Sequence, residues 1–187
     1  MITEEQGKKL ISLAKKTISL RLAGKEIQVD PETKKEFQDK KGAFVTLKIS
    51  GELRGCIGIT EPIYPLWQTI VYAAESAAFG DPRFGPLSKE EFGKIKAEIS
   101  ILTAPELVKV KDASEYPDKI KIGEDGLIIE GRYGKGLLLP QVATEWKWDV
   151  LEFLKHTCEK AGLDSDAWKD LDNKIYKFQA QIFTEKE

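Results

Sequence analysis

The segment LRGCIG at residues 53–58 combines an arginine, a cysteine and two glycines within six positions. In an extended strand, residues two apart share a face, so the side chains of Arg54 and Cys56 would lie side by side, with their Cα atoms roughly 7 Å apart. A guanidinium at that range favours the thiolate, which predicts a lowered pKa for Cys56 and a reactive thiol. Gly58, on the same face, would leave room for a ligand to approach the backbone.

The same segment also has a structural explanation, and its residues alone leave both open. Cys56 could be a small buried hydrophobic side chain, while Gly55 and Gly58 could mark a bulge or a twist in the strand. On the chemical explanation, Cys56 and Arg54 are catalytic residues and both glycines belong to the substrate site.

A second candidate group lies in the loop DPRFGP, where Asp81 and Arg83 would sit on one side of a turn. There they could pair with each other, cap the next helix or contact an anionic ligand, and both are candidate substrate-binding residues. Two of the four arginines of this lysine-rich chain stand at positions 54 and 83, which indicates bidentate contacts. The alternative is a structural role, in which the pair pins the loop to a neighbouring lobe.

The segment LPQVATEWKWD supplies a third candidate group. Glu145 within it could act as a base for Cys56 or hold Arg54, and it is the remaining candidate catalytic residue. The alternative is an exposed carboxylate in the first turn of a helix, where the helix dipole favours a negative charge. Trp146 and Trp148 are expected to pack in the interior rather than to form a stacking platform.

The composition excludes several classes of function. The chain has 187 residues, with 29 Lys and Arg against 31 Asp and Glu, so the net charge of −2 gives no field for binding nucleic acid. One histidine and two cysteines cannot build a four-ligand zinc site, and no metal site is expected. The residues identify no cofactor.

The chain is expected to be a cytoplasmic protein without membrane contact. No stretch approaches the ~20 apolar residues of a membrane span, and the N-terminus resembles no secretion signal. Both cysteines are therefore expected to be free thiols. Abundant Lys and Glu with a single asparagine are typical of proteins from heat-adapted organisms.

Hydrophobic periodicity predicts the elements that would position these residues. Helices are expected over 3–22, 66–79, 89–94, 142–148 and 149–161, hairpins over 43–60 and 126–140, and strands over 97–102 and 174–183. The stretches 24–42 and 112–123 are expected to be mostly connectors. Because strands and helices do not alternate as in βαβ units, the pattern predicts an α+β fold with antiparallel sheets.

Taken together, the motifs resemble those of the AMMECR domain family, whose prokaryotic members are called protein A of the AmmeMemoRadiSam system. The matching segments are, in chain order, GAFVTLK, LRGCIG, DPRFGPL, EISILTAP, GEDGLIIEG, LLLPQVATEWKWD and KAGL. The hexapeptide LRGCIG is highly specific to that family. The resemblance identifies residues 3–185 as a single domain of this type.

The resemblance implies a larger and a smaller α+β lobe, each with an antiparallel sheet flanked by helices, and a cleft between them that the hexapeptide faces. It also implies partners, because neighbouring genes or fused domains often encode a Memo-type protein, itself similar to non-haem iron dioxygenases, and a radical enzyme that uses S-adenosylmethionine. The residues that it carries over are Arg54, Gly55, Cys56, Gly58, Asp81, Arg83, Phe84, Pro140, Glu145, Trp148 and Asp149.

Two functions follow from these observations, and the sequence does not decide whether the chain is an enzyme. The first is a thiol-dependent enzyme or enzyme subunit, in which Arg54 activates Cys56 and Asp81, Arg83 and Glu145 line the cleft. The second is a non-catalytic binding or scaffold module that recruits a Memo-like or radical S-adenosylmethionine protein, with the hexapeptide as a structural hinge. Neither the substrate nor the reaction follows from the residues.

Overall fold

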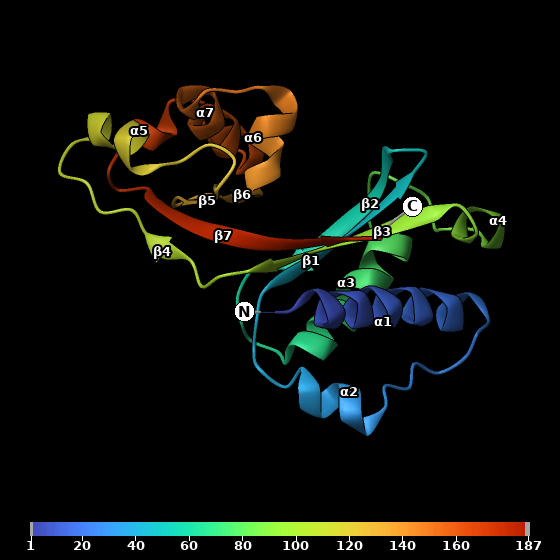
Figure 1. Cartoon of the computed structure of the whole chain (residues 1–187). Helices are drawn as coiled ribbons and strands as arrows, with labels where there is room; N and C mark the ends of the chain where they lie inside the picture. Colours follow the sequence, from blue (N-terminus) through green and yellow to red (C-terminus); the bar gives the residue numbers. More distant parts are fainter. Residues whose placement is uncertain (1, 186–187) are drawn as a thin grey trace. The chain divides into compact units, whose positions relative to one another are not determined.

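The computed structural model describes residues 2–185 (Figure 1). These residues form two compact units. The first unit contains residues 2–102 and 181–185, and the second is Thr103–Ala180. Strand β7, Lys174–Thr184, runs from the second unit into the first. Each unit has its own antiparallel strand pairs and its own cluster of buried hydrophobic residues.

The first unit combines helices with an antiparallel sheet. Its elements are, in chain order, α1 (Glu4–Leu22), α2 (Pro31–Glu36), β1 (Ala43–Ile49), β2 (Glu52–Ile59), α3 (Leu66–Phe79), α4 (Lys89–Phe92) and β3 (Ile95–Leu102). Strand β1 pairs with β2 on one side and with β3 on the other, so β2 is the outer strand. The hairpin turn at Ser50 and Gly51 uses positive φ angles of 53° and 85°, as tight hairpin turns require.

Helices α1 and α3 cover one face of this sheet (Figure 1). Helix α1 begins with a capping box, in which the Thr3 side chain accepts a hydrogen bond from the backbone N–H of Gln6. Leu10, Ala14 and Ile18 then repeat at four-residue spacing, and each is 0% exposed. Burying a large aliphatic side chain stabilises the fold by about 1.5–3 kcal/mol, so this stripe holds the helix in place.

Helix α3 packs so closely on β2 that position 55 must be glycine. A Cβ atom added at Gly55 would overlap the carbonyl oxygen of Ala77. The face of α3 in contact with the sheet is built largely from small residues, namely Ala73, Ala74, Ala77 and Ala78. This packing gives a structural reason for the glycine, and a role of Gly55 in a substrate site stays a prediction.

The second unit has the same α+β character. Its elements are β4 (Glu106–Leu107), η1 (Ala113–Glu115), α5 (Tyr116–Lys119), β5 (Asp125–Glu130), β6 (Lys135–Leu138), α6 (Pro140–Trp146), α7 (Val150–Lys160), η2 (Ala167–Lys169) and most of β7. Strand β5 pairs with β6 and β7, and β4 pairs with β7, all antiparallel. Cys158 on α7 is 0% exposed within this core, where it serves as a small hydrophobic side chain.

The predicted α+β class is confirmed, and the helices expected over 3–22, 66–79 and 149–161 correspond to α1, α3 and α7. The connector expected over 112–123 differs, because it contains η1 and α5. Asp112 caps η1 through the backbone N–H of Ser114, and a proline occupies the first turn of α5, where no helical N–H is needed.

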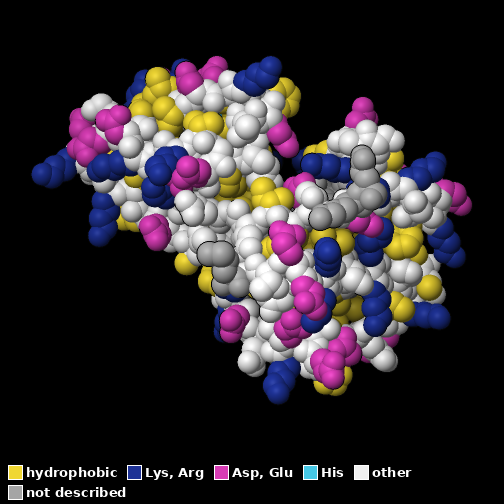
Figure 2. All heavy atoms as spheres, viewed as in Figure 1, with side chains coloured by type: hydrophobic (Ala, Val, Ile, Leu, Met, Phe, Trp, Pro, Cys, Tyr) yellow, Lys and Arg dark blue, Asp and Glu magenta, His cyan; other side chains and the backbone are white. Residues whose placement is uncertain are grey.

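Surface charge is mixed in sign. On the face shown in Figure 2, Lys and Arg side chains are interspersed with Asp and Glu, so this face carries no extended field of one sign. Within residues 2–185, no helix has both the length and the apolar character needed to cross a membrane.

We predict that Gly55→Ala destabilises the protein by about 1–3 kcal/mol, because the added methyl group would force β2 and α3 apart. Gly93→Ala is the matched control, since a Cβ atom there meets nothing closer than 3.8 Å. Urea denaturation measures both variants. Equal midpoints for the two would contradict the close packing inferred at Gly55.

Candidate functional site

The thiol of Cys56 lies against the hydroxyl of Thr46 on the neighbouring strand. The register of β1 and β2 pairs these two residues directly, and the Thr46 Oγ1 atom is 3.2 Å from the Cys56 Sγ atom. The register of β1 and β3 places Glu98 on the other side of Thr46. The half-buried thiol therefore has a hydroxyl and a carboxylate along the same line across the sheet.

Asp81 and Arg83 bind the backbone of Cys56. The Asp81 carboxylate accepts a hydrogen bond from the Cys56 N–H at 2.9 Å, and the Arg83 guanidinium donates to the Cys56 carbonyl oxygen at 3.3 Å. The two side chains also pair with each other, with Arg83 Nε and Nη2 donating to Asp81 at 2.9 and 2.7 Å. Of the alternatives for this loop, pairing is confirmed, and the loop is pinned to β2 of its own unit.

Arg54 is held by Glu91, the last but one residue of α4. Its Nε and Nη2 atoms donate to the two Glu91 carboxylate oxygens at 2.7 and 3.0 Å, and Nη2 also donates to the Gly85 carbonyl oxygen at 3.0 Å. The Phe84 ring lies 5.6 Å from the Arg54 guanidinium carbon and 5.5 Å from that of Arg83. The bidentate geometry explains why arginine stands here in a lysine-rich chain.

The prediction that Arg54 lowers the pKa of Cys56 is wrong. Burial raises the pKa of the Cys56 thiol, and the opposing effects of the Thr46 hydroxyl and the Arg83 charge do not reverse that direction. Asp81 and Glu98 raise the pKa further, because their negative charges disfavour a thiolate. The resting thiol is therefore neutral at pH 7.

The pKa values of Asp81 and Glu91, the two carboxylates that pair with these arginines, are lowered. Hydrogen bonds from Arg83 hold the pKa of Asp81 far below its usual range, and hydrogen bonds from Arg54 lower the pKa of Glu91 to about 2. The Asp81 side chain is only 2% exposed, so its charge depends on these partners rather than on water.

Gly58 packs closely against strand β1. A Cβ atom added at Gly58 would overlap the carbonyl oxygen of Ala43 and crowd the ring of Phe44. Approach of a ligand to the backbone of Gly58 stays a prediction, since Gly58 also lines the pocket described below. Glycine is needed here for close strand packing.

Glu145 lies in the second unit, where its side chain is exposed. Helix α6 begins at Pro140, so Glu145 falls in its last turn and not in the first, as one alternative had it. The prediction that Glu145 holds Arg54 is wrong, since Glu91 does so. A role for Glu145 as a base for Cys56 stays a prediction.

The tryptophans near Glu145 differ from each other. Trp146 is 68% exposed, contrary to the expected packing, and its ring stacks on Trp148 with centroids 6.0 Å apart. Trp148 packs against the buried cluster of the second unit and stacks in turn on His156 at 3.9 Å. Asp149 caps α7, accepting a hydrogen bond from the Glu152 N–H.

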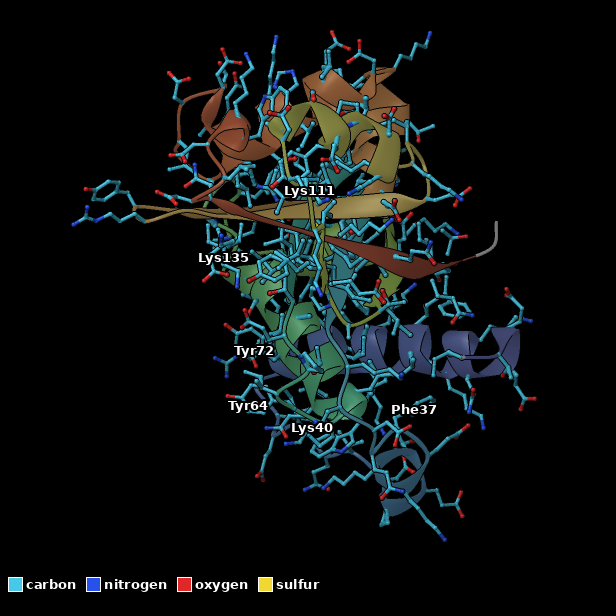
Figure 3. All side chains as sticks on the ribbon, turned by 90° about the vertical axis from the view of Figure 1, so that its left-hand side faces the viewer. Phe37, Lys40, Tyr64, Tyr72, Lys111 and Lys135 are labelled. Atoms are coloured by element: carbon cyan, nitrogen blue, oxygen red, sulfur yellow. The ribbon has the colours of Figure 1, made fainter. Side chains whose placement is uncertain are left out.

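A pocket of about 520 Å³ adjoins the end of β2 at Gly58. Its walls come from the end of β2, from the segment that follows it and from α3, and they are formed by Ile59, Thr60, Glu61, Ile63, Tyr64, Gln68 and Tyr72. Figure 3 shows Tyr64 and Tyr72 along the same side of α3. Tyr64 is 42% and Tyr72 is 53% exposed, so the pocket has an aromatic rim, and the exposed Glu61 also lines it.

Sequence reasoning missed Thr46, Glu91, Tyr64 and Tyr72. Glu91 was recognisable as the third residue of a capping box after Ser88, but nothing local distinguished it from the other glutamates as the partner of Arg54. Cross-strand register, which brings Thr46 to Cys56, depends on the folded sheet. Among residues 2–185, no group of three or more His, Cys, Asp or Glu is placed to hold a metal ion.

We predict that Asp81→Asn lowers the free energy of unfolding at pH 7 by about 2–3 kcal/mol, because Arg83 loses its charged partner. The folded-state pKa of Asp81 is lowered, so its contribution is fully present above the unfolded value near 4 and is lost as the pH falls. The difference between wild type and variant should therefore narrow between pH 5 and pH 2.5 in urea denaturation. The exposed Glu52→Gln is the control, and a difference that stays constant with pH would refute the argument.

We predict that iodoacetamide labels Cys56 more slowly than an unfolded thiol at pH 7, with a rate that rises only above the ordinary thiol pKa of ~8.5. Burial raises the pKa of Cys158 to about 11, so Cys158 should react more slowly still. Arg83→Gln should raise the pKa of Cys56 further, whereas Arg54→Gln should leave it in place. A labelling pKa below that of a free thiol would contradict this account.

Known proteins are similar to this chain over nearly its whole length. The AMMECR1 family model matches residues 11–183. A protein of Methanocaldococcus jannaschii is 51% identical over 191 residues, covering 100% of this chain and 94% of that protein, and one of Methanothermobacter thermautotrophicus is 46% identical over 185 residues, covering 98% and 96%. The crystal structure of an uncharacterized protein from Pyrococcus horikoshii is 48% identical, with a TM-score of 0.95 over 99% of this chain and 94% of that one. The chain therefore belongs to the AMMECR1 family.

Proposed function

We propose that this chain is a non-catalytic binding module, in which the hexapeptide and the DPRFGP loop build a rigid strand edge. The observation that carries the proposal is the internal pairing of the motif charges. Arg54 is bound by Glu91 and Arg83 by Asp81, so each guanidinium already has a carboxylate partner within the protein. The neutral thiol of Cys56 supports the same conclusion.

A surface that could take a partner lies beside this edge. The pocket next to Gly58 is bordered by Ile63, Tyr64 and Tyr72, whose side chains are between 42% and 53% exposed. Exposed aliphatic and aromatic side chains gathered at one place are typical of protein contact sites. The resemblance to the AmmeMemoRadiSam system suggests a Memo-like protein or a radical S-adenosylmethionine enzyme as the partner. A cytoplasmic location is part of the proposal.

We predict that Cys56→Ser retains partner binding. The serine hydroxyl can keep the contact with Thr46, and the backbone groups that Asp81 and Arg83 hold are unchanged. Co-purification of the tagged full chain with a Memo-like protein and with a radical S-adenosylmethionine enzyme measures this. Equal capture by wild type and variant supports the binding module.

If a folded Cys56→Ser protein no longer captures the partner, partner binding depends on the thiol itself. Capture of neither partner by the wild type would overturn the proposed recruitment. Folding of the variant is checked by its urea midpoint before the capture is compared.

A thiol-dependent enzyme is the second candidate. The observation that favours it is the position of Arg83, whose positive charge lowers the pKa of Cys56 against the larger effect of burial. The labelling experiment on Cys56 described above decides this candidate, because a nucleophilic thiol must be ionised to react.

A further inference from the structure

We propose that the open end of β2, at Gly58, binds an extended segment of a partner protein by strand addition, with the side chains of that segment seated in the adjoining pocket. The proposal deepens the binding function proposed above and rests on it. The occupant is a short stretch of extended chain with apolar side chains at alternate positions and no proline opposite Gly58.

The direction of the backbone groups follows from the ladder between β1 and β2. In an antiparallel pair, residues along one strand alternate between those that bond to the partner strand and those whose N–H and C=O point away from it. The backbone groups of Cys56 point away from β1, because Asp81 and Arg83 bind them. Gly58 is two residues further along with its register unbroken, so its N–H and C=O also point outward.

The loop at Cys56 shows what this edge accepts. There, a carboxylate oxygen takes the N–H and a guanidinium donates to the carbonyl oxygen, which are the contacts that a neighbouring strand would make. The Asp81–Arg83 pair thus satisfies the outward N–H and C=O groups of one residue, Cys56, on this edge. The next residue with outward groups, Gly58, faces the pocket instead.

The pocket supplies the side-chain contacts that an added strand needs. Ile63, Tyr64 and Tyr72 are half-exposed, and they stand beside the outward backbone groups of Gly58. Strand addition combines these two kinds of contact, since main-chain hydrogen bonds give affinity and pockets for alternate side chains give selectivity. A small ligand would use the pocket but leave the backbone edge unpaired.

A single extended segment fits this edge better than a second copy of the chain. The Asp81–Arg83 pair covers the edge at Cys56, and the free stretch begins only two residues further along. Symmetric pairing of two β2 strands would bring a second such loop against the same short stretch. A slender segment of a partner avoids that conflict.

The test uses the full chain and a short blocked peptide of alternating valine and threonine as the probe. Amide hydrogen exchange followed by NMR should show the Gly58 amide protected when the peptide is added, because its N–H gains an acceptor. Tyr72→Ala should weaken peptide binding about tenfold, which corresponds to ~1.4 kcal/mol. Tyr133→Ala is the matched control, because Tyr133 is 84% exposed in the second unit and should leave the affinity unchanged.

A peptide that is N-methylated at its central residues tests the backbone contribution directly, and it should fail to protect the Gly58 amide. Peptide binding without protection at Gly58, or no binding at millimolar peptide, would overturn strand addition. Protection that grows with protein concentration in the absence of peptide would also overturn it, in favour of a second copy. If a Memo-like or radical enzyme partner binds while the Gly58 amide exchanges freely, strand addition fails and the binding function stands. If no partner binds, the binding function itself fails.

Discussion

The hydrogen bonds between the Asp81–Arg83 pair and the backbone of Cys56 are the contacts on which this part of the molecule depends. An outer strand presents unpaired N–H and C=O groups, which must bond to something or remain open to other chains. Here one carboxylate and one guanidinium satisfy both groups of a single residue. Because the Asp81 carboxylate is buried, these contacts also determine where the loop can lie against β2.

The position of that loop explains the use of arginine. Once the loop is docked, the Gly85 carbonyl oxygen and the Glu91 carboxylate both come within reach of Arg54. A lysine ammonium could not supply two parallel donors to Glu91 and still reach the carbonyl, whereas a planar guanidinium does both. The same side chain that looked like an activator of the thiol thus links β2 to α4.

Most of the secondary-structure elements could be predicted from local patterns in the sequence. Hydrophobic periodicity predicted the helices and the alternating strands, because it depends on neighbours along the chain. The pairing of Asp81 with Arg83 was foreseeable for the same reason. Three features could not be foreseen, because each depends on burial and on the register between distant segments. They are the pairing of Arg54 with Glu91, the contact of Phe44 at Gly58 and the raised pKa of Cys56.

The partial capping of β2 has a functional meaning that neither complete capping nor a free edge would have. A strand covered along its whole length would be purely structural, and a long bare edge would invite aggregation. Side chains cover the edge at Cys56, and the glycine two residues later leaves its backbone groups beside an uncovered pair of tyrosines. An opening this short favours a segment whose backbone and alternate side chains both fit, so the constraint that protects the edge also makes it selective.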